Sequence, residues 1–197
     1  TIINLDLSIQ VAIATAIFFL LCIALIIRRK RKRSFYSRKL ERALQTVKKE
    51  EAKSIIIPDG LGGMIEIERL VLIEQGLLII ETYPMSGHLF GADHIDQWTQ
   101  IIDGRSFKFT NPLHRIYNSK HALQTLAPKI PIFCRIVFSE NSNFPKGKPE
   151  EVSVIDSLSD DLKSLSEYPS INQQGQIAWE RIIRVARTDG QSLLRDV

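Results

Sequence analysis

The chain contains few of the residues that mark metal-binding, nucleotide-binding or hydrolase sites. Its 197 residues include two cysteines, Cys22 and Cys134, with no CxxC motif and no Cys/His cluster. This pattern excludes a zinc site of the usual spacing. The sequence also lacks a phosphate-binding glycine loop, a GxSxG motif and an internal repeat. None of the four histidines lies beside a nucleophile, so we expect surface or hydrogen-bonded structural roles for them.

Charge is missing from a long stretch near the N-terminus. Residues 7–27 are almost wholly apolar and uncharged, and about 20 apolar residues span a bilayer as a helix. A basic run follows at once, whereas the N-terminal side offers only Asp6. The basic run consists of Arg28, Arg29, Lys30, Arg31, Lys32 and Arg33. Because cytoplasmic flanks are rich in Lys and Arg, we expect the N-terminus outside and the rest of the chain in the cytoplasm.

A cleaved signal peptide is the alternative interpretation of this stretch. It would need a positive region before the apolar run and a small-residue cleavage site after it, and the sequence shows neither. We therefore predict a single-pass anchor in the inner (cytoplasmic) membrane of a bacterium. In this topology Cys22 lies inside the membrane and Cys134 in the cytoplasm, so the two cannot pair within one chain.

The excess of basic residues is concentrated in the run that follows the apolar stretch. The net charge is +4, and Arg28–Arg33 supply +6, which leaves about −2 for the rest. Topology and contacts with anionic lipid headgroups therefore account for the high pI. Binding of nucleic acid phosphates by the same run is the alternative.

The sequence divides into five parts. We predict a short extracytoplasmic N-terminus at 1–6, a transmembrane helix at 7–27 and a basic juxtamembrane helix at 28–53. A main domain follows at 54–166, and a linker with an amphipathic helix at 167–197. The fold class predicted for the main domain is α/β, with a mixed sheet flanked by helices.

Two hairpins give this domain its strongest local signals. Apolar runs at 65–73 and 77–83 flank Glu74-Gln75-Gly76, which predicts a β-hairpin. Asp103-Gly104 between 98–102 and 105–109 is typical of a type I′ turn between two strands. Asn111-Pro112 then favours a helix start. The apolar run at 132–138 predicts a buried inner strand.

The first hairpin carries a group of acidic residues. If its turn centres near Gln75, the numbers of paired residues sum to roughly 149–150. Side chains two apart share a face of a strand, so we expect Glu66, Glu68, Glu81 and Tyr83 to cluster. Carboxylates packed together repel unless a cation or a proton lies between them. Metal-dependent nucleases hold Mg²⁺ in this way.

This hairpin and the sequence that follows it resemble the NERD (nuclease-related) domain, a branch of the PD-(D/E)XK nuclease superfamily. The resemblance runs from about Ser54 to about Leu165 and rests on the order and spacing of several short segments. They are Ile67-Glu68-Arg69-Leu70-Val71-Leu72, Gly76-Leu77-Leu78-Ile79-Ile80-Glu81-Thr82, Gly87-His88-Leu89-Phe90-Gly91, Trp98, Phe109-Thr110-Asn111-Pro112-Leu113 and Ile136-Val137-Phe138.

The departures from the family pattern bear on activity. The family has Asp-His where this chain has Glu68-Arg69, and Glu-x-Lys where it has Glu81-Thr82-Tyr83. A tyrosine cannot supply the positive charge of that lysine. The Gln that usually follows the Asn-Pro pair is Arg115 here. A Glu in the first helix often completes the family's metal site, and Glu41 is the nearest candidate, which we expect to be solvated.

We therefore interpret the chain as a NERD-like domain with an eroded active site. The first hypothesis is a catalytically inactive interaction or scaffold protein, or a small accessory subunit of a membrane assembly, with no cofactor. The second is a metal-dependent nuclease, in which Glu68 and Glu81 would hold Mg²⁺ and Lys108 or Arg115 would replace the lysine. The third is a non-cleaving nucleic-acid binder that would use Arg69, Lys108, Arg115 and the basic run.

The C-terminal helix offers a further contact surface. Trp179, Ile182, Ile183 and Ala186 form an apolar stripe. The stripe can pack on the domain, or Trp179, Ile182 and Ile183 can dock into a partner or rest on the membrane surface.

Overall fold

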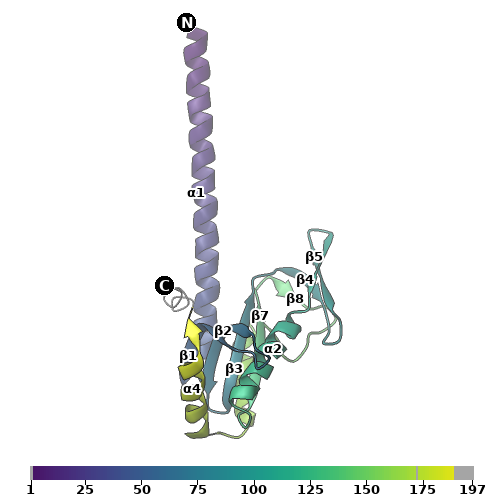
Figure 1. The fold of residues 1–197 in the computed structure, drawn as a ribbon. Coiled ribbons are helices and arrows are strands. Elements are labelled where there is room, and N and C mark those ends of the chain that lie inside the picture. Colours follow the sequence, from purple (N-terminus) through teal and green to yellow (C-terminus); the bar gives the residue numbers. More distant parts are fainter. Residues whose placement is uncertain (1, 172, 189–197) are drawn as a thin grey trace. The chain divides into compact units, whose positions relative to one another are not determined.

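The protein forms two compact units, residues 1–39 and 40–197. The structure is a computed structural model that describes residues 2–171 and 173–188 (Figure 1). Its elements are α1 (Ile2–Gln45), β1 (Glu50–Pro58), β2 (Met64–Ile73), β3 (Gly76–Tyr83), β4 (Gly87–Phe90), β5 (Gln97–Ile102), β6 (Arg105–Thr110), α2 (Pro112–Leu126), β7 (Ile132–Phe138), β8 (Ser142–Asn143), β9 (Val152–Val154), α3 (Leu158–Lys163), a 3-10 helix η1 (Ser164–Glu167), α4 (Gln173–Val185) and β10 (Arg187–Thr188).

The first unit is most of the single long helix α1. Its apolar side chains are exposed, as Phe18 at 66% and Phe19 at 69% illustrate. The most apolar window has a mean hydropathy of 2.7, and α1 is long and apolar enough to cross a membrane. An N-terminal signal sequence meets the same criterion. A helix apolar on all sides is stable only where lipid or protein covers it.

The second unit is a mixed α/β domain with two sheets, and the larger one carries the candidate site. The six-stranded sheet has the order β10-β1-β2-β3-β7-β9, and the four-stranded sheet the order β6-β5-β4-β8. Strands β1, β2 and β3 are antiparallel, whereas β7 runs parallel to β3 and β9 runs parallel to β7. A mixed sheet with helices on its faces is the architecture that the sequence predicted.

Helices α2 and α4 cover one face of the larger sheet and build the main core. That core includes Leu70, Leu72, Leu77 and Ile79 from the hairpin, with Ile116 of α2 and Trp179 of α4. The intervening residues Val71, Ile73, Leu78 and Ile80 are buried on the opposite face. Two buried faces explain why β2 and β3 are apolar almost throughout rather than alternating.

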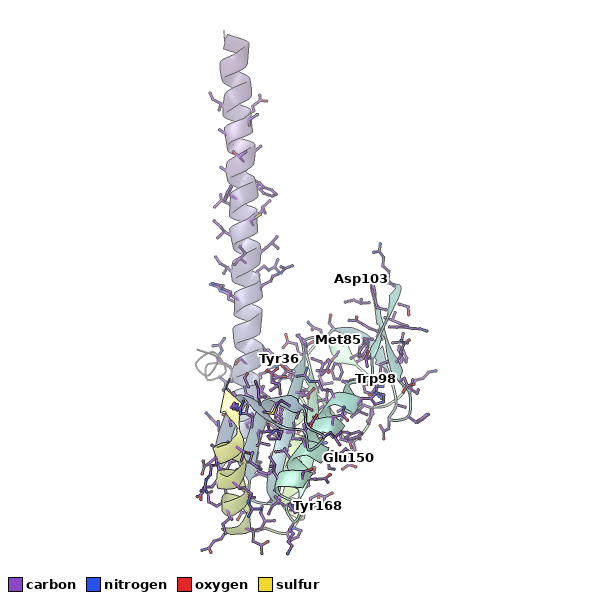
Figure 2. The ribbon with its side chains drawn as sticks, viewed as in Figure 1. Tyr36, Met85, Trp98, Asp103, Glu150 and Tyr168 are labelled. Atoms are coloured by element: carbon purple, nitrogen blue, oxygen red, sulfur yellow. The ribbon has the colours of Figure 1, made fainter. Side chains whose placement is uncertain are left out.

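Both predicted hairpins are present. Strands β2 and β3 pair from Arg69↔Ile80 to Ile73↔Gly76, so paired numbers sum to 149 as expected. In the second hairpin Asp103 and Gly104 both have positive φ, +50° and +73°, as a type I′ turn requires. Asp103 marks the tip of that hairpin in Figure 2.

The juxtamembrane helix ends earlier than predicted. We expected helix through Lys53, but α1 ends at Gln45 and Glu50–Lys53 begin β1. These residues pair with Arg69–Leu72 of β2. Sheet pairing with β2 and the packing of Ala52 against the core outweigh the high helix propensity of a Glu-Glu-Ala-Lys segment, because tertiary contacts override local propensity.

A buried ionic network joins the last turn of α1 to β1 and β2. The Nη1 atom of Arg69 lies 2.8 Å from Glu41 Oε1 and also donates to Glu51 Oε1. The Arg69 side chain is only 10% exposed. Lys53 also donates to Glu41, at 2.8 Å. Glu41 is thus paired rather than solvated, and the hydrogen bonds from Lys53 and Arg69 lower its pKa to about 2.

Removing the Arg69 guanidinium should destabilise the domain. In Arg69→Met, Glu51 keeps Lys48, which donates to it at 2.7 Å, and Glu41 keeps Lys53. The expected cost is therefore that of the lost charged hydrogen bonds, about 2 kcal/mol. Lys53→Met is the matched control: Lys53 is 52% exposed, so its loss should cost less than about 1 kcal/mol. Urea unfolding of both variants measures the difference, and equal losses would contradict the role given to Arg69.

Candidate functional site

The candidate site forms where β2 leaves β3. Their pairing stops at Arg69↔Ile80, and Ser54, opposite this point on β1, has a φ of +49°. Ile67 and Leu70 both face the main core, although residues three apart face opposite sides of a regular strand. The alternation is therefore broken at Glu68 and Arg69.

Glu68 fills the gap that the strand separation leaves. Its Oε2 accepts a hydrogen bond from the backbone N–H of Thr82 at 2.9 Å, and its Oε1 accepts one from Thr82 Oγ1 at 2.6 Å. The carboxylate thus replaces a backbone acceptor that β2 no longer offers to β3. Both oxygens of Glu68 have partners inside the protein.

Glu81 is the retained carboxylate and lies deep in the site. Its side chain is 2% exposed, and its Oε1 lies 3.5 Å from Nε of Arg115 on α2. Oε1 accepts no hydrogen bond from any residue that the structure describes. Burial raises the pKa of Glu81 to about 7, the charge of Arg115 opposes this, and the charge of Glu68 adds to it. This carboxyl group therefore takes up a proton at a higher pH than an ordinary glutamate does.

Tyr83 faces the same side of β3 as Glu81. Its ring packs on Phe138 of β7, with centroids 5.6 Å apart, and it borders the main core. Burial raises the pKa of its hydroxyl, and the charge of Glu81 raises it further. The phenol therefore stays neutral where the family pattern has a lysine.

Of the four residues expected to cluster, three meet. Glu68, Glu81 and Tyr83 interact electrostatically. Glu66 is exposed and sits between Ile65 and Ile67, which pack on the main core. Its side chain therefore points to the other face, because the broken alternation at Glu68 and Arg69 reverses the faces of residues 64–67.

The basic residues considered from the sequence are dispersed. Lys108 is exposed on β6 and paired with Thr99 in the four-stranded sheet, whereas Glu81 is in the six-stranded one. Arg69 is buried in the network with Glu41 and Glu51. Arg115 alone joins the site. Arg28–Arg31 are exposed on α1, and the side chains of Lys32 and Arg33 lie outside those described.

Helix α4 packs on the domain, one of the three alternatives considered for it. Trp179 is 4% exposed and Ile182 is fully buried. Both belong to the main core, while Ile183 is 38% exposed. The side chains of Trp179 and Ile182 are therefore packed in the main core.

Two features of the site were missed from the sequence. The first is Thr82, whose backbone and hydroxyl hold Glu68. The second is the loop contact of the Asn111 amide, whose Nδ2 donates to the carbonyls of Ala92, Asp93 and Ile95. The position of Asn111 at the start of α2 was predicted, and its Oδ1 accepts a hydrogen bond from the Leu113 N–H. The side chain thus ties the β4–β5 loop to the start of α2, the helix that carries Arg115.

Steric constraints explain the two glycines at the ends of β4, Gly87 and Gly91. Gly87 has a φ of +92°, and a Cβ atom there would lie 2.5 Å from the Ile101 carbonyl oxygen. A Cβ on Gly91 would lie 2.0 Å from the Trp98 ring. Both glycines thus allow close approach to β5, Gly87 to the Ile101 carbonyl and Gly91 to the buried Trp98, which Figure 2 labels.

The residues present do not fit a magnesium site. Mg²⁺ prefers octahedral oxygen coordination, usually with carboxylates. Here both Glu68 oxygens are engaged by Thr82, and Arg115 already provides the positive charge next to Glu81. Among the described residues, no group of three or more His, Cys, Asp or Glu side chains could hold a metal ion.

The titration of Glu81 should make stability depend on pH. Its folded pKa of about 7 lies above the ordinary value of 4.5, so the folded state binds more protons between these values. Stability should therefore fall as the pH rises from about 4.5 to 7, by on the order of 2–3 kcal/mol. Glu81→Gln should remove this slope and be the more stable protein at pH 8.

Urea unfolding at pH 5 and pH 8 tests this, with exposed Glu66→Gln as the matched control. The control should keep the slope of the wild-type protein. A Glu81→Gln variant with an unchanged slope would show that another group titrates.

Comparisons with known proteins place the chain in a family. The model of the family described as "Nuclease-related domain" (NERD) matches residues 32–139, more than half of the chain. An uncharacterized protein of Bacillus anthracis is 23% identical over 128 residues, which cover 62% of this chain and 60% of that protein. The chain thus spans about three-fifths of the length of this relative. No solved structure matches. With the match covering the end of α1 and both hairpins, the chain belongs to the nuclease-related (NERD) domain family.

Proposed function

We propose that this NERD-family protein is a membrane-tethered interaction module that does not cleave nucleic acids. The observation that carries the proposal is the pairing of buried Glu81 with Arg115. A guanidinium stays protonated at any physiological pH. It therefore competes permanently with a divalent cation for the retained carboxylate.

The rest of the site supports the same conclusion. A hydrolytic site of this type needs two or more free carboxylates and a group that orients or deprotonates water. Glu68 is engaged by Thr82, Tyr83 is a partly buried neutral phenol, and Arg115 cannot accept a proton. Lys108, the other residue considered as a replacement, is exposed on the second sheet.

Binding of nucleic acid without cleavage has less support. Of its proposed phosphate contacts, Arg69 is buried between two carboxylates, and Arg115 is paired with Glu81. Lys108 and Arg28–Arg31 remain exposed. In our proposal the basic run contacts lipid headgroups, and one further lysine does not make the basic groove that phosphate binding requires. We therefore rank this function below a protein-binding role.

The tether defines where such a module would act. Helix α1 is apolar and long enough to cross a membrane, and Arg28–Arg33 follow its apolar part. In our proposal the basic run contacts anionic lipid headgroups on the cytoplasmic side. The domain then serves as a scaffold or accessory subunit of a membrane assembly, because its site is neutralised while its fold is kept.

Purified full-length protein in detergent should show no metal-dependent cleavage. We would test single- and double-stranded DNA and RNA with Mg²⁺ or Mn²⁺, with Glu81→Ala beside the wild type. Both should match the no-protein background. Cleavage by the wild type that is lost in Glu81→Ala would refute the proposal and establish a nuclease.

Metal binding can be measured without activity. A ligand present at ten times its Kd stabilises the folded state by about 1.4 kcal/mol. We expect Mg²⁺ and Mn²⁺ to raise the melting temperature of the wild type no more than that of Glu81→Ala. Tyr83→Lys/Arg115→Gln, which restores two positions of the family pattern, is the matched variant: a larger metal-dependent rise there would show that these two residues close the site.

The tether and its orientation are tested by labelling. In a Cys22→Ser background, Asn4→Cys, in the predicted extracytoplasmic segment 1–6, should react with an impermeant maleimide on intact cells, whereas Asn141→Cys should react only after lysis. Protein lacking residues 1–33 should leave the membrane fraction. Equal labelling at both positions on intact cells would refute the proposed orientation.

A further inference from the structure

A mainly apolar groove lies between the end of helix α2 and helix α4. Among its lining residues Ala127, Ile130 and Ala178 are buried, whereas Pro128 and Ile177 are exposed. The groove measures ≈ 320 Å³, and a cavity of roughly 150 Å³ already accommodates a benzene-sized group. It therefore has room for one aliphatic or aromatic side chain.

Both walls of this groove are fixed by the fold. On the α2 side, the Ala127 N–H donates to the Leu123 carbonyl at 2.8 Å, and the Ile130 N–H donates to the Ala127 carbonyl at 3.2 Å. On the α4 side, Ala178 and Trp179 are packed in the main core. A preformed groove of this kind does not have to be ordered when a ligand binds, which lowers the cost of binding.

Two cations border the groove, one from each wall. Lys129 lies just after α2 and Arg181 lies on α4, and both side chains are exposed. The Nη1 atom of Arg181 donates to the Leu126 carbonyl at 3.4 Å, which leaves its other N–H groups available. Neither cation has a carboxylate partner among the residues that the structure describes.

Negative charge is missing from the same place. No Asp or Glu belongs to the lining of the groove. Glu180, the one acidic residue of α4, lies outside it and accepts a hydrogen bond from Gln176 at 3.4 Å. The groove is thus apolar inside and positive at two of its edges. A ligand with an apolar group between anionic groups would be complementary to both features.

We propose that this groove binds a short acidic segment of a partner protein. One Leu, Ile or Phe side chain of the segment fills the groove, and Asp or Glu residues on either side of it pair with Lys129 and Arg181. The inference rests on the proposed function, since it names the class of partner that the interaction module would recognise. It concerns the domain alone and does not depend on the orientation of the tether.

The shape of the surface favours a peptide over a lipid bilayer as the occupant. A helix that lies on a membrane inserts its apolar face, often with Trp, into the acyl boundary. Here the apolar face of α4, with Trp179 and Ile182, is packed in the main core. The remaining apolar surface includes a hollow, which an inserted side chain fills and a flat bilayer does not.

A display library of short random peptides tests the chemistry of the groove without assuming a sequence. The selection would use full-length protein in nonionic detergent. We expect the enriched peptides to place Asp or Glu on both sides of a Leu, Ile or Phe. The most enriched peptide, labelled with a fluorophore, then serves as the probe in anisotropy titrations, and added salt should weaken its binding.

Arg181→Gln and Ile177→Gln should each weaken binding of this probe by about fivefold, because they remove one exposed ion pair and one apolar contact. Arg184→Gln and Ile183→Gln are the matched controls, since both residues are exposed on α4 and neither lines the groove. The controls should bind the probe as the wild type does. All of these variants should keep the wild-type melting temperature, which shows that the fold is intact.

The proposal is overturned if the selection enriches no peptides, or enriches peptides without acidic residues. Equal binding of the probe by the groove variants and their controls would also overturn it. A rise in the melting temperature with short-chain phosphatidylglycerol that Arg181→Gln abolishes, with no peptide enriched, would assign the groove to lipid headgroups. Metal-dependent nucleolytic cleavage would refute the proposed function and leave the peptide measurements unaffected, whereas a groove that binds no peptide leaves the cleavage assay unaffected.

Discussion

Charges buried on the two faces of the β2–β3 hairpin must be neutralised within the protein, and this requirement organises the domain. On one face Arg69 is held by Glu41 and Glu51. On the other, Arg115 lies against Glu81, while Glu68 is held at the strand separation by Thr82. An uncompensated buried charge costs several kcal/mol, so each of these residues constrains the elements that carry its partners. The end of α1 and strand β1 are positioned in this way, whereas α2 is held by its core contacts and brings the half-exposed Arg115 to Glu81.

The local break in β2 makes this arrangement possible. Without it, Glu68 and Arg69 would follow the strand alternation, and Ile67 could not share a core with Leu70. The break frees one backbone donor of β3, and the Glu68 carboxylate accepts its hydrogen bond. A residue type suited to binding metal is thereby used to complete the sheet. The same carboxylate could complete the sheet or bind a metal, and here both of its oxygens accept hydrogen bonds from Thr82.

The family relationship and the site geometry thus carry different information. The match to the nuclease-related domain family concerns the fold, over residues 32–139. Activity depends on side chains at a few positions, and fold alone does not determine it. In this chain those positions hold a neutral phenol, an engaged carboxylate and a carboxyl group paired with arginine. In our proposal this combination neither binds a metal nor activates water.

The sequence by itself determined the elements whose signals are local. The long uncharged apolar stretch indicated a helix able to cross a membrane, and Asp103-Gly104 indicated a type I′ turn. The apolar runs around Gly76 indicated the first hairpin and its register. These predictions succeed because hydrophobic periodicity and turn chemistry act over a few residues. The resemblance also singled out Glu68, Glu81, Tyr83 and Arg115 before their positions were known. Only the tertiary structure decided the partners. The end of α1 at Gln45, the four-stranded sheet, the outward position of Glu66 and the network around Arg69 all depend on contacts between distant segments. Glu41 and Arg69 are 28 residues apart in the chain, and no local pattern encodes which buried charge neutralises which.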